Sequence, residues 1–126
     1  MITAAQTKSI TTTVMLAPAE CANTAAATQG TGVDISGYEG TLLFTQLVGV
    51  VTAGTIVGSI ITSASSNLSS PTTVATFTSC GTSTDLIAES VSVECSACQQ
   101  YVGYIGTITT GPAVTGCAVL GSPKYV

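Results

Sequence analysis

Five cysteines are the residues of this sequence best suited to metal or redox chemistry. Cys95 and Cys98 form a CxxC pair, with Cys80 upstream, Cys117 downstream and Cys21 far from the others. A structural zinc site takes four ligands, usually from two such pairs or from one pair and two histidines. Because one pair and two single cysteines would have to converge here, we predict no metal site. Zinc bound by Cys80, Cys95, Cys98 and Cys117 is kept as an alternative.

The CxxC pair also raises the question of redox chemistry. A thioredoxin-type motif places its first cysteine at the start of a helix in a βαβ unit, whereas strand-forming residues flank this pair on both sides. Two interpretations remain. Free cysteines behave as small hydrophobic residues and suit the core of a β-sandwich. Alternatively, one or two disulfides form, within Cys95–Cys98 or between Cys80 and one of that pair, and the odd total leaves at least one thiol unbridged.

Groups for general acid–base catalysis are sparse. The sequence contains no histidine, and its six acids are scattered, without a close pair whose pKa values could be separated. The two basic residues, Lys8 and Lys124, lie near the termini and are poorly placed to activate a serine. The glycines between Gly30 and Gly40 precede no helix that could bind a phosphate. We therefore predict that the protein is not an enzyme and has no catalytic residue and no cofactor.

Composition and charge exclude several classes of partner. Charged residues make up 6% of the 126 residues and the net charge is −4, against about 25% charged residues in a typical soluble domain. Nucleic-acid binding needs clustered Lys and Arg, which two basic residues cannot supply. The stretch from Leu42 to Ile61 is interrupted by polar residues and glycines, and Val14 to Ala17 is too short for a secretion signal. We expect neither a nucleic-acid nor a membrane partner, but a surface that contacts other protein subunits.

Strand signals run along the chain, whereas no window shows helical periodicity. Residues 11–16 are rich in β-branched side chains and predict a first strand that Pro18 ends. Residues 41–51 predict a mostly apolar strand buried between two layers. With residues 55–63 they are predicted to form a hairpin around Ala53-Gly54. Further strands are predicted near residues 74–79, 87–94, 100–108 and 113–120.

This spacing of about seven or eight short strands predicts an all-β fold, a single antiparallel β-sandwich or jelly-roll-like barrel. Residues 1–30 are predicted to hold a possible extended N-terminal arm and the first strand, and to contact a partner. Within them, Met1 to about Ala17 is expected to reach a neighbouring subunit. Residues 31–126 are predicted to form the sandwich domain.

Three motifs carry a resemblance to a known family. Residues 32–40 read GVDISGYEG and precede the paired apolar strands, residues 101–107 read YVGYIGT, and residues 118–124 read AVLGSPK. In this order they resemble the first half, the penultimate strand and the closing strand of small head proteins of tailed bacteriophages. The resemblance covers residues 32–124. The chain departs from that family in its five cysteines and in lacking the basic residues usual in the penultimate strand.

The resemblance implies a capsid decoration (cement) protein. Such a protein is a virion structural protein, made in the host cytoplasm, that lies on the outer surface of an icosahedral capsid. There it contacts the major capsid protein and other copies of itself, commonly as a homotrimer at three-fold positions, and stabilises the shell by bridging capsomers. The alternatives are another virion component, such as a tail-tube, head–tail connector or fibre-base module, and a bacterial surface adhesin or pilus-type subunit.

Overall fold

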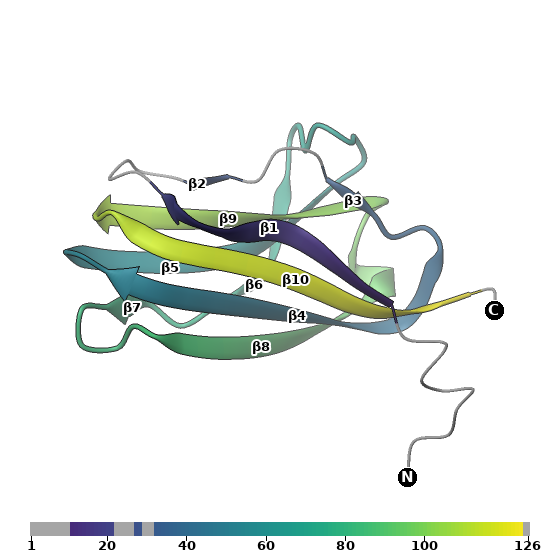
Figure 1. Cartoon of the computed structure of the whole chain (residues 1–126). Coiled ribbons are helices and arrows are strands. Elements are labelled where there is room, and N and C mark those ends of the chain that lie inside the picture. The colour runs from purple at the N-terminus through teal and green to yellow at the C-terminus, as the bar shows by residue number, and fades with distance from the viewer. Residues whose placement is uncertain (1–10, 22–26, 29–31, 125–126) are drawn as a thin grey trace, which may run out of the picture.

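The computed structural model of the protein describes residues 11–21, 27–28 and 32–124. They form two antiparallel sheets packed face to face, with one short 3₁₀ turn (Figure 1). Within these residues no helix has the length and apolar character needed to span a membrane. The elements are β1 (Thr11–Cys21), β2 (Ala27–Thr28), β3 (Val33–Asp34), β4 (Tyr38–Val51), β5 (Gly54–Ser63), β6 (Thr72–Thr76), β7 (Cys80–Gly81), β8 (Ile87–Glu94), η1 (Cys95–Ala97), β9 (Tyr101–Thr110) and β10 (Ala113–Pro123).

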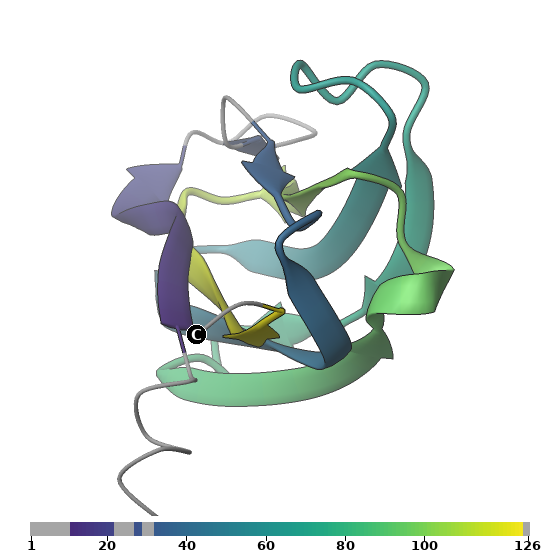
Figure 2. The ribbon, with the colours of Figure 1, turned by 90° about the vertical axis from the view of Figure 1, so that its right-hand side faces the viewer.

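The strand order of the two sheets is that of a jelly roll. One sheet has the order β1-β10-β4-β8, and the other has the order β2-β9-β5-β6, with β3 also paired to β9 and β7 to β5. Figure 2 looks at the sandwich from one end and shows the two layers. The predicted all-β sandwich is confirmed, and the described strands do not close into a barrel.

The predicted hairpin is wrong, because β4 and β5 belong to different sheets. The chain crosses between the sheets at Gly54, whose φ is +72° and whose place no other residue could take, since a Cβ there would collide with the backbone of β9. The crossing from β9 to β10 lies beside it. The Gly111 N–H donates to the Ala53 carbonyl at 2.8 Å, and the Thr52 N–H donates to the Pro112 carbonyl at 2.9 Å. The sequence pattern of two apolar strands around a turn fits a hairpin within one sheet and a crossing between two sheets equally well. Pairing with strands far along the chain decides which of the two forms.

β1 continues through Pro18 to Cys21, contrary to the predicted end of the first strand. It pairs with β10 at the edge of the four-stranded sheet, with irregular register on both sides of Leu16. An edge strand with bulges tolerates proline because the missing N–H is not needed for pairing. Met15 points into the core and is 5% exposed. Residues 11–17 of the predicted arm thus pair within the chain's own sandwich, and residues 1–10 lie outside the described residues.

The core fills the space between the two sheets and is divided into two clusters. β4 shows the pattern best, because Leu42, Phe44, Gln46 and Val48 alternate inward and are nearly or fully buried. The larger cluster contains Met15, Ile35, Leu42, Phe44, Ile60, Phe77, Val93, Val102, Tyr104, Cys117 and Val119. The smaller cluster contains Val48, Val51, Ile56, Cys80, Ile108 and Ala113.

Candidate interaction surface

The structure separates the four cysteines considered as zinc ligands. Cys80 lies in the smaller core cluster and Cys117 in the larger one, while Cys95 and Cys98 pack against the larger cluster from η1 and the residue after it. No three metal-ligating side chains come together in the part of the chain that the structure describes. The geometry therefore does not support the zinc alternative. All five cysteines, Cys21 included, are free thiols, so neither predicted disulfide is present among them.

Burial raises the pKa of every one of these thiols. The effect is large at Cys117, where burial raises the pKa to about 12 although a hydrogen bond to Ala118 opposes it. The thiolate is the form of cysteine that binds metals and attacks electrophiles. At neutral pH these side chains are therefore protonated, and the two buried ones, Cys80 and Cys117, serve as small core residues.

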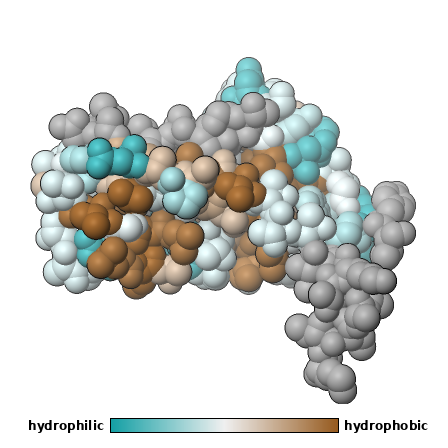
Figure 3. All heavy atoms as spheres, in the orientation of Figure 1, coloured by the Kyte–Doolittle hydropathy of each residue, from teal (hydrophilic) through white to brown (hydrophobic). Residues whose placement is uncertain are grey.

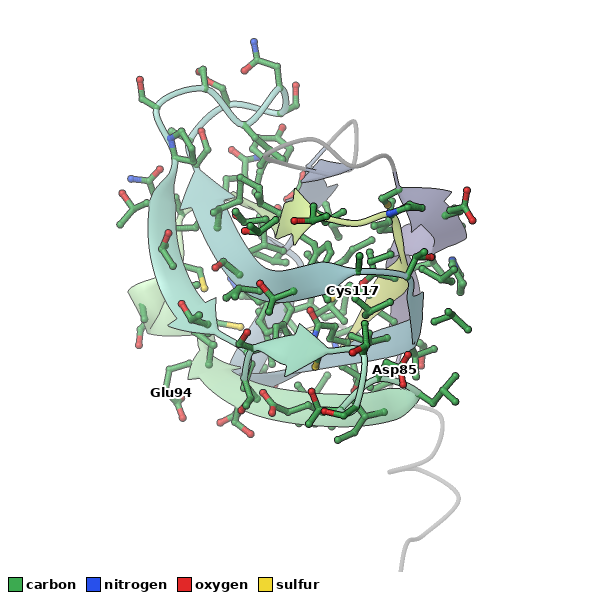
Figure 4. The ribbon with its side chains drawn as sticks, turned by 90° about the vertical axis from the view of Figure 1, so that its left-hand side faces the viewer. Asp85, Glu94 and Cys117 are labelled. Carbon is green, nitrogen blue, oxygen red and sulfur yellow. The ribbon has the colours of Figure 1, made fainter. Side chains whose placement is uncertain are left out.

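The carboxylates stabilise strand ends and do not converge. Asp85 Oδ2 accepts a hydrogen bond from the Val51 N–H at 3.0 Å, and Glu94 Oε1 accepts one from the Thr41 hydroxyl at 2.8 Å. Figure 4 shows Asp85 and Glu94 apart from one another near β8, with Cys117 between the sheets. These carboxylates therefore act in local hydrogen bonds at the ends of strands and do not form a cluster of acidic groups.

The outer side of the four-stranded sheet stands out instead, and we call it the apolar face. Two of its side chains, Val14 and Leu47, are 61% and 47% exposed. Carboxylates lie toward its ends, at Glu20, Glu39 and Glu94, and the described residues between them contribute apolar or hydroxyl side chains. Figure 3 shows hydrophobic side chains gathered over β1, β4 and β10. The apolar residues that define the face are Val14, Leu43, Leu47, Ala88, Val114, Ala118 and Leu120.

Two grooves on the apolar face share a common wall. Leu47 and Pro18 line both grooves and form the ridge between them. The first groove has a volume of about 320 Å³ and the second about 220 Å³. Their other lining residues are Val48, Gly49, Leu86, Ile87, Ala88, Val114 and Thr115 in the first, and Val14, Leu16, Thr45, Cys117 and Ala118 in the second. A ridge between two apolar grooves is a shape that another protein surface can fill.

The wall of the first groove contains Leu86, an exposed leucine in an unfavourable backbone conformation. Its side chain is 74% exposed and its φ is +55°. The left-handed region costs a residue other than glycine about 1–2 kcal/mol. Two hydrogen bonds hold this loop against β4, since the Leu86 N–H donates to the Gly49 carbonyl at 3.2 Å and Asp85 accepts from the Val51 N–H. The loop is thereby fixed with its leucine at the edge of the apolar face.

A buried polar cluster supports the apolar face from below. The Tyr104 hydroxyl, on β9 in the opposite sheet, donates to Gln46 Oε1 at 2.6 Å and lies 2.9 Å from the Thr115 hydroxyl. Thr115 donates to the Leu47 carbonyl at 3.2 Å. Burial raises the pKa of Tyr104, so the phenol keeps its proton for this role. Gly58 leaves the necessary space, because a Cβ there would lie 1.8 Å from Gln46 Oε1.

The sequence interpretation missed the apolar face. Residues 41–51 predicted a strand buried between two layers, whereas β4 is covered on its inner side and Leu47 and Val50 remain exposed on the molecular surface. An uninterrupted apolar run has two explanations, burial between two layers of the same chain or burial against another molecule. The low content of charge did predict contact with other subunits, but nothing in the sequence assigned that contact to the outer side of β4.

Comparisons with known proteins define the class of the fold. No family model matches the sequence, and no curated protein sequence matches it either. A solved structure described as "Bacillus endospore appendages form a novel family of disulfide-linked pili" is similar, with a TM-score of 0.55 and 16% sequence identity over 91% of this chain and 88% of the other. At this identity the likeness shows the fold alone.

A second solved structure is described as "Structure of infectious bursal disease virus Gx strain". It has a TM-score of 0.41 and 12% identity, and it matches 92% of this chain but 32% of the other. The fold is shared with the pilus structure described above, and a shared fold does not by itself define a function.

Proposed function

We propose that this chain is a virion structural protein that decorates and stabilises an icosahedral phage capsid by bridging capsomers of the major capsid protein. The observation that carries the proposal is the apolar face, an exposed sheet surface that is uncharged across its centre and carries two grooves. Contiguous apolar surface of this kind marks a protein interaction site. The resemblance of residues 32–124 to small head proteins of tailed bacteriophages directs the proposal to a capsid.

The mechanism we propose is mechanical and involves no catalysis, no metal and no cofactor. A shell that encloses packed DNA is under outward pressure, and its weak points are the junctions between capsomers. A small subunit that bridges such a junction adds a contact that is repeated over the whole particle. Because many linked contacts act together, each one needs to contribute only a few kcal/mol. The partners in this proposal are the major capsid protein and further copies of the chain, commonly three, on the outer surface of the virion.

The proposal is tested by cryo-electron microscopy of particles that contain the chain. We expect density for the jelly-roll sandwich on the outer surface of the capsid, at positions where capsomers meet. Particles that lack the protein should break at lower temperature or lower osmotic stress than complete ones. Density inside a tail tube or at the head–tail connector, or particles of unchanged strength without the protein, would overturn the proposal.

A pilus-type subunit is a second candidate, favoured by the likeness in fold to the disulfide-linked pili described above. This chain has thiols that could form such links, because Cys21, Cys95 and Cys98 are only partly buried. Electron microscopy of the purified protein under oxidising and reducing conditions separates the two candidates. Filaments that form with an oxidant and shorten with a reductant would favour the pilus. Discrete small oligomers in both conditions would favour decoration.

A further inference from the structure

We propose that the occupant of the apolar face is a second copy of this chain, packed sheet against sheet. The inference rests on the proposed function in so far as it assigns this face to one of the two partners named there. It commits the face to a contact that joins copies in pairs, and it leaves contact with the capsid protein and the three-fold contact of the proposed trimer to other surfaces. Three observations favour a second copy: the distribution of charge, the shape of the face and the chemistry of the grooves.

The distribution of charge suits contact between like molecules. Each copy carries six acidic and two basic residues, so two copies repel each other at long range. They can meet closely only through a surface whose centre is free of carboxylates. The apolar face has this property, because Glu20 and Glu94 lie toward its ends and the centre around Leu47 is apolar. An apolar centre with a polar rim is the usual arrangement of a protein–protein interface.

The shape of the face allows a reciprocal contact between two copies. The ridge formed by Leu47 and Pro18 stands between two apolar grooves, so a second copy turned about a two-fold axis brings its own ridge to a groove of the first. Contacts are then reciprocal, as in most dimers of identical chains. The exposed side chains of Val14 and Leu86, at the outer walls of the second and first grooves, would be buried in the same contact.

The chemistry of the grooves is less suited to other occupants. A small polar ligand is oriented by a few converging polar groups, and the described groove residues supply only two hydroxyl side chains, Thr45 and Thr115. The second of these is already engaged with the Leu47 carbonyl and Tyr104. Anionic partners such as nucleic acid or acidic lipid headgroups would need basic side chains, and the lining residues include none.

The test compares the association of three forms of the full chain in reducing buffer. Sedimentation velocity over a range of concentrations is measured for the wild type, for Leu47→Glu and for Thr107→Glu. Thr107 is exposed on β9 in the other sheet, so its variant introduces the same charge away from the apolar face. Thermal unfolding of each form shows whether the variants keep the fold.

The wild type is expected to associate as its concentration rises, and Thr107→Glu should behave in the same way. Leu47→Glu should raise the dissociation constant at least about a hundredfold, because it buries a charge and removes an apolar contact. A wild type that stays monomeric at every concentration, or an association that Leu47→Glu leaves unchanged, would overturn the inference. If Leu47→Glu does not fold, Val14→Glu at the second groove takes its place with the same expected result.

Binding of the same three forms to capsids distinguishes failure of this inference from failure of the proposed function. If the wild type is monomeric and binds capsids, and the Leu47→Glu variant no longer binds them, the apolar face is the surface that contacts the capsid protein. That result overturns the inference and supports the function. If the wild type associates through Leu47 but binds no capsid, the inference is supported and the proposed function is overturned.

Discussion

The two faces of β4 both carry apolar residues, but they differ in how far these residues are buried. Leu42 faces the other sheet and is fully buried, whereas Leu47, five positions along the same strand, is 47% exposed. The inner side chains are covered by the opposite sheet, whereas the outer ones, Leu43, Thr45 and Leu47, are half-buried or exposed. The difference teaches that an apolar strand in this protein serves two tasks, holding the monomer together on one face and presenting a surface on the other.

The largest expected effect is on the free energy of unfolding, and the same substitution, leucine to alanine, distinguishes the two faces of β4. Leu42→Ala should lower the free energy of unfolding by about 2–5 kcal/mol, because it leaves a cavity in the core. Leu47→Ala should change it by less than about 0.5 kcal/mol, as is usual for exposed positions. Urea denaturation, at a protein concentration where the wild type is monomeric, measures both. Equal losses at the two positions would show that both faces of β4 are covered within the monomer.

The next effect concerns the buried hydrogen bond between Tyr104 and Gln46, which joins the two sheets through the core. Tyr104→Phe should lower the free energy of unfolding by about 1–3 kcal/mol, since the buried Gln46 carbonyl loses its donor. The double variant Tyr104→Phe with Gln46→Leu should lose less than the sum of the single changes. Thermal unfolding of the four proteins gives the coupling energy. Strictly additive losses would mean that the two side chains do not act as one unit.

A smaller effect is expected at the loop that holds Leu86. Asp85→Ala should cost about 1 kcal/mol, because the Val51 N–H loses its acceptor, and it should weaken association through the apolar face. Asp34→Ala is the control, since Asp34 also accepts a backbone hydrogen bond, from Ser36, but in the loop before β4. Hydrogen exchange at Val51 and sedimentation are the measurements. Equal effects of both variants on association would argue against a role for this loop.

The smallest effect on stability at neutral pH is expected from ionisation of the buried Cys117 thiol. Burial raises the pKa of Cys117 from 9.0 to about 12, so its protonated form is favoured in the folded state. The corresponding stability is complete below pH 9 and is lost as the pH rises from 9 toward 12. Urea unfolding followed by far-UV circular dichroism across this range should show the loss, and Cys117→Val should reduce it. Alkylation at pH 8 should modify Cys21 well before Cys117, and similar rates would contradict the burial of Cys117.

Much of the fold could be predicted from the sequence because strand formation is local. The β-branched residues of β1, the alternation in β8 and the two closing strands lie close to their predicted positions. The pairing of β4 and β5 could not be predicted in the same way. Their separation depends on β10, which pairs with β4, and on β9, which pairs with β5, and both partners lie far along the chain from the strands they pair with.

The functional surface was harder to predict than the fold. Which face of β4 the chain leaves uncovered depends on how all the other strands are arranged, and hydropathy alone gives Leu42 and Leu47 the same value. The cysteines illustrate the opposite error. Their spacing drew attention to metal and disulfide chemistry, and the fold distributes them between two core clusters and a surface turn. Residue types indicate possible chemistry, and only distances decide whether it can occur.

The pairing of β1 with β10 has a consequence for the order of events during synthesis. The apolar face is built by both strands, and they come from opposite ends of the described sequence. A ribosome-bound chain that still lacks β10 has the edge strand but no partner for it, and β4 then has only β8 beside it. The apolar face is therefore complete only after β10 has left the ribosome, and until then β1 and β4 present unpaired strand edges, which favour aggregation.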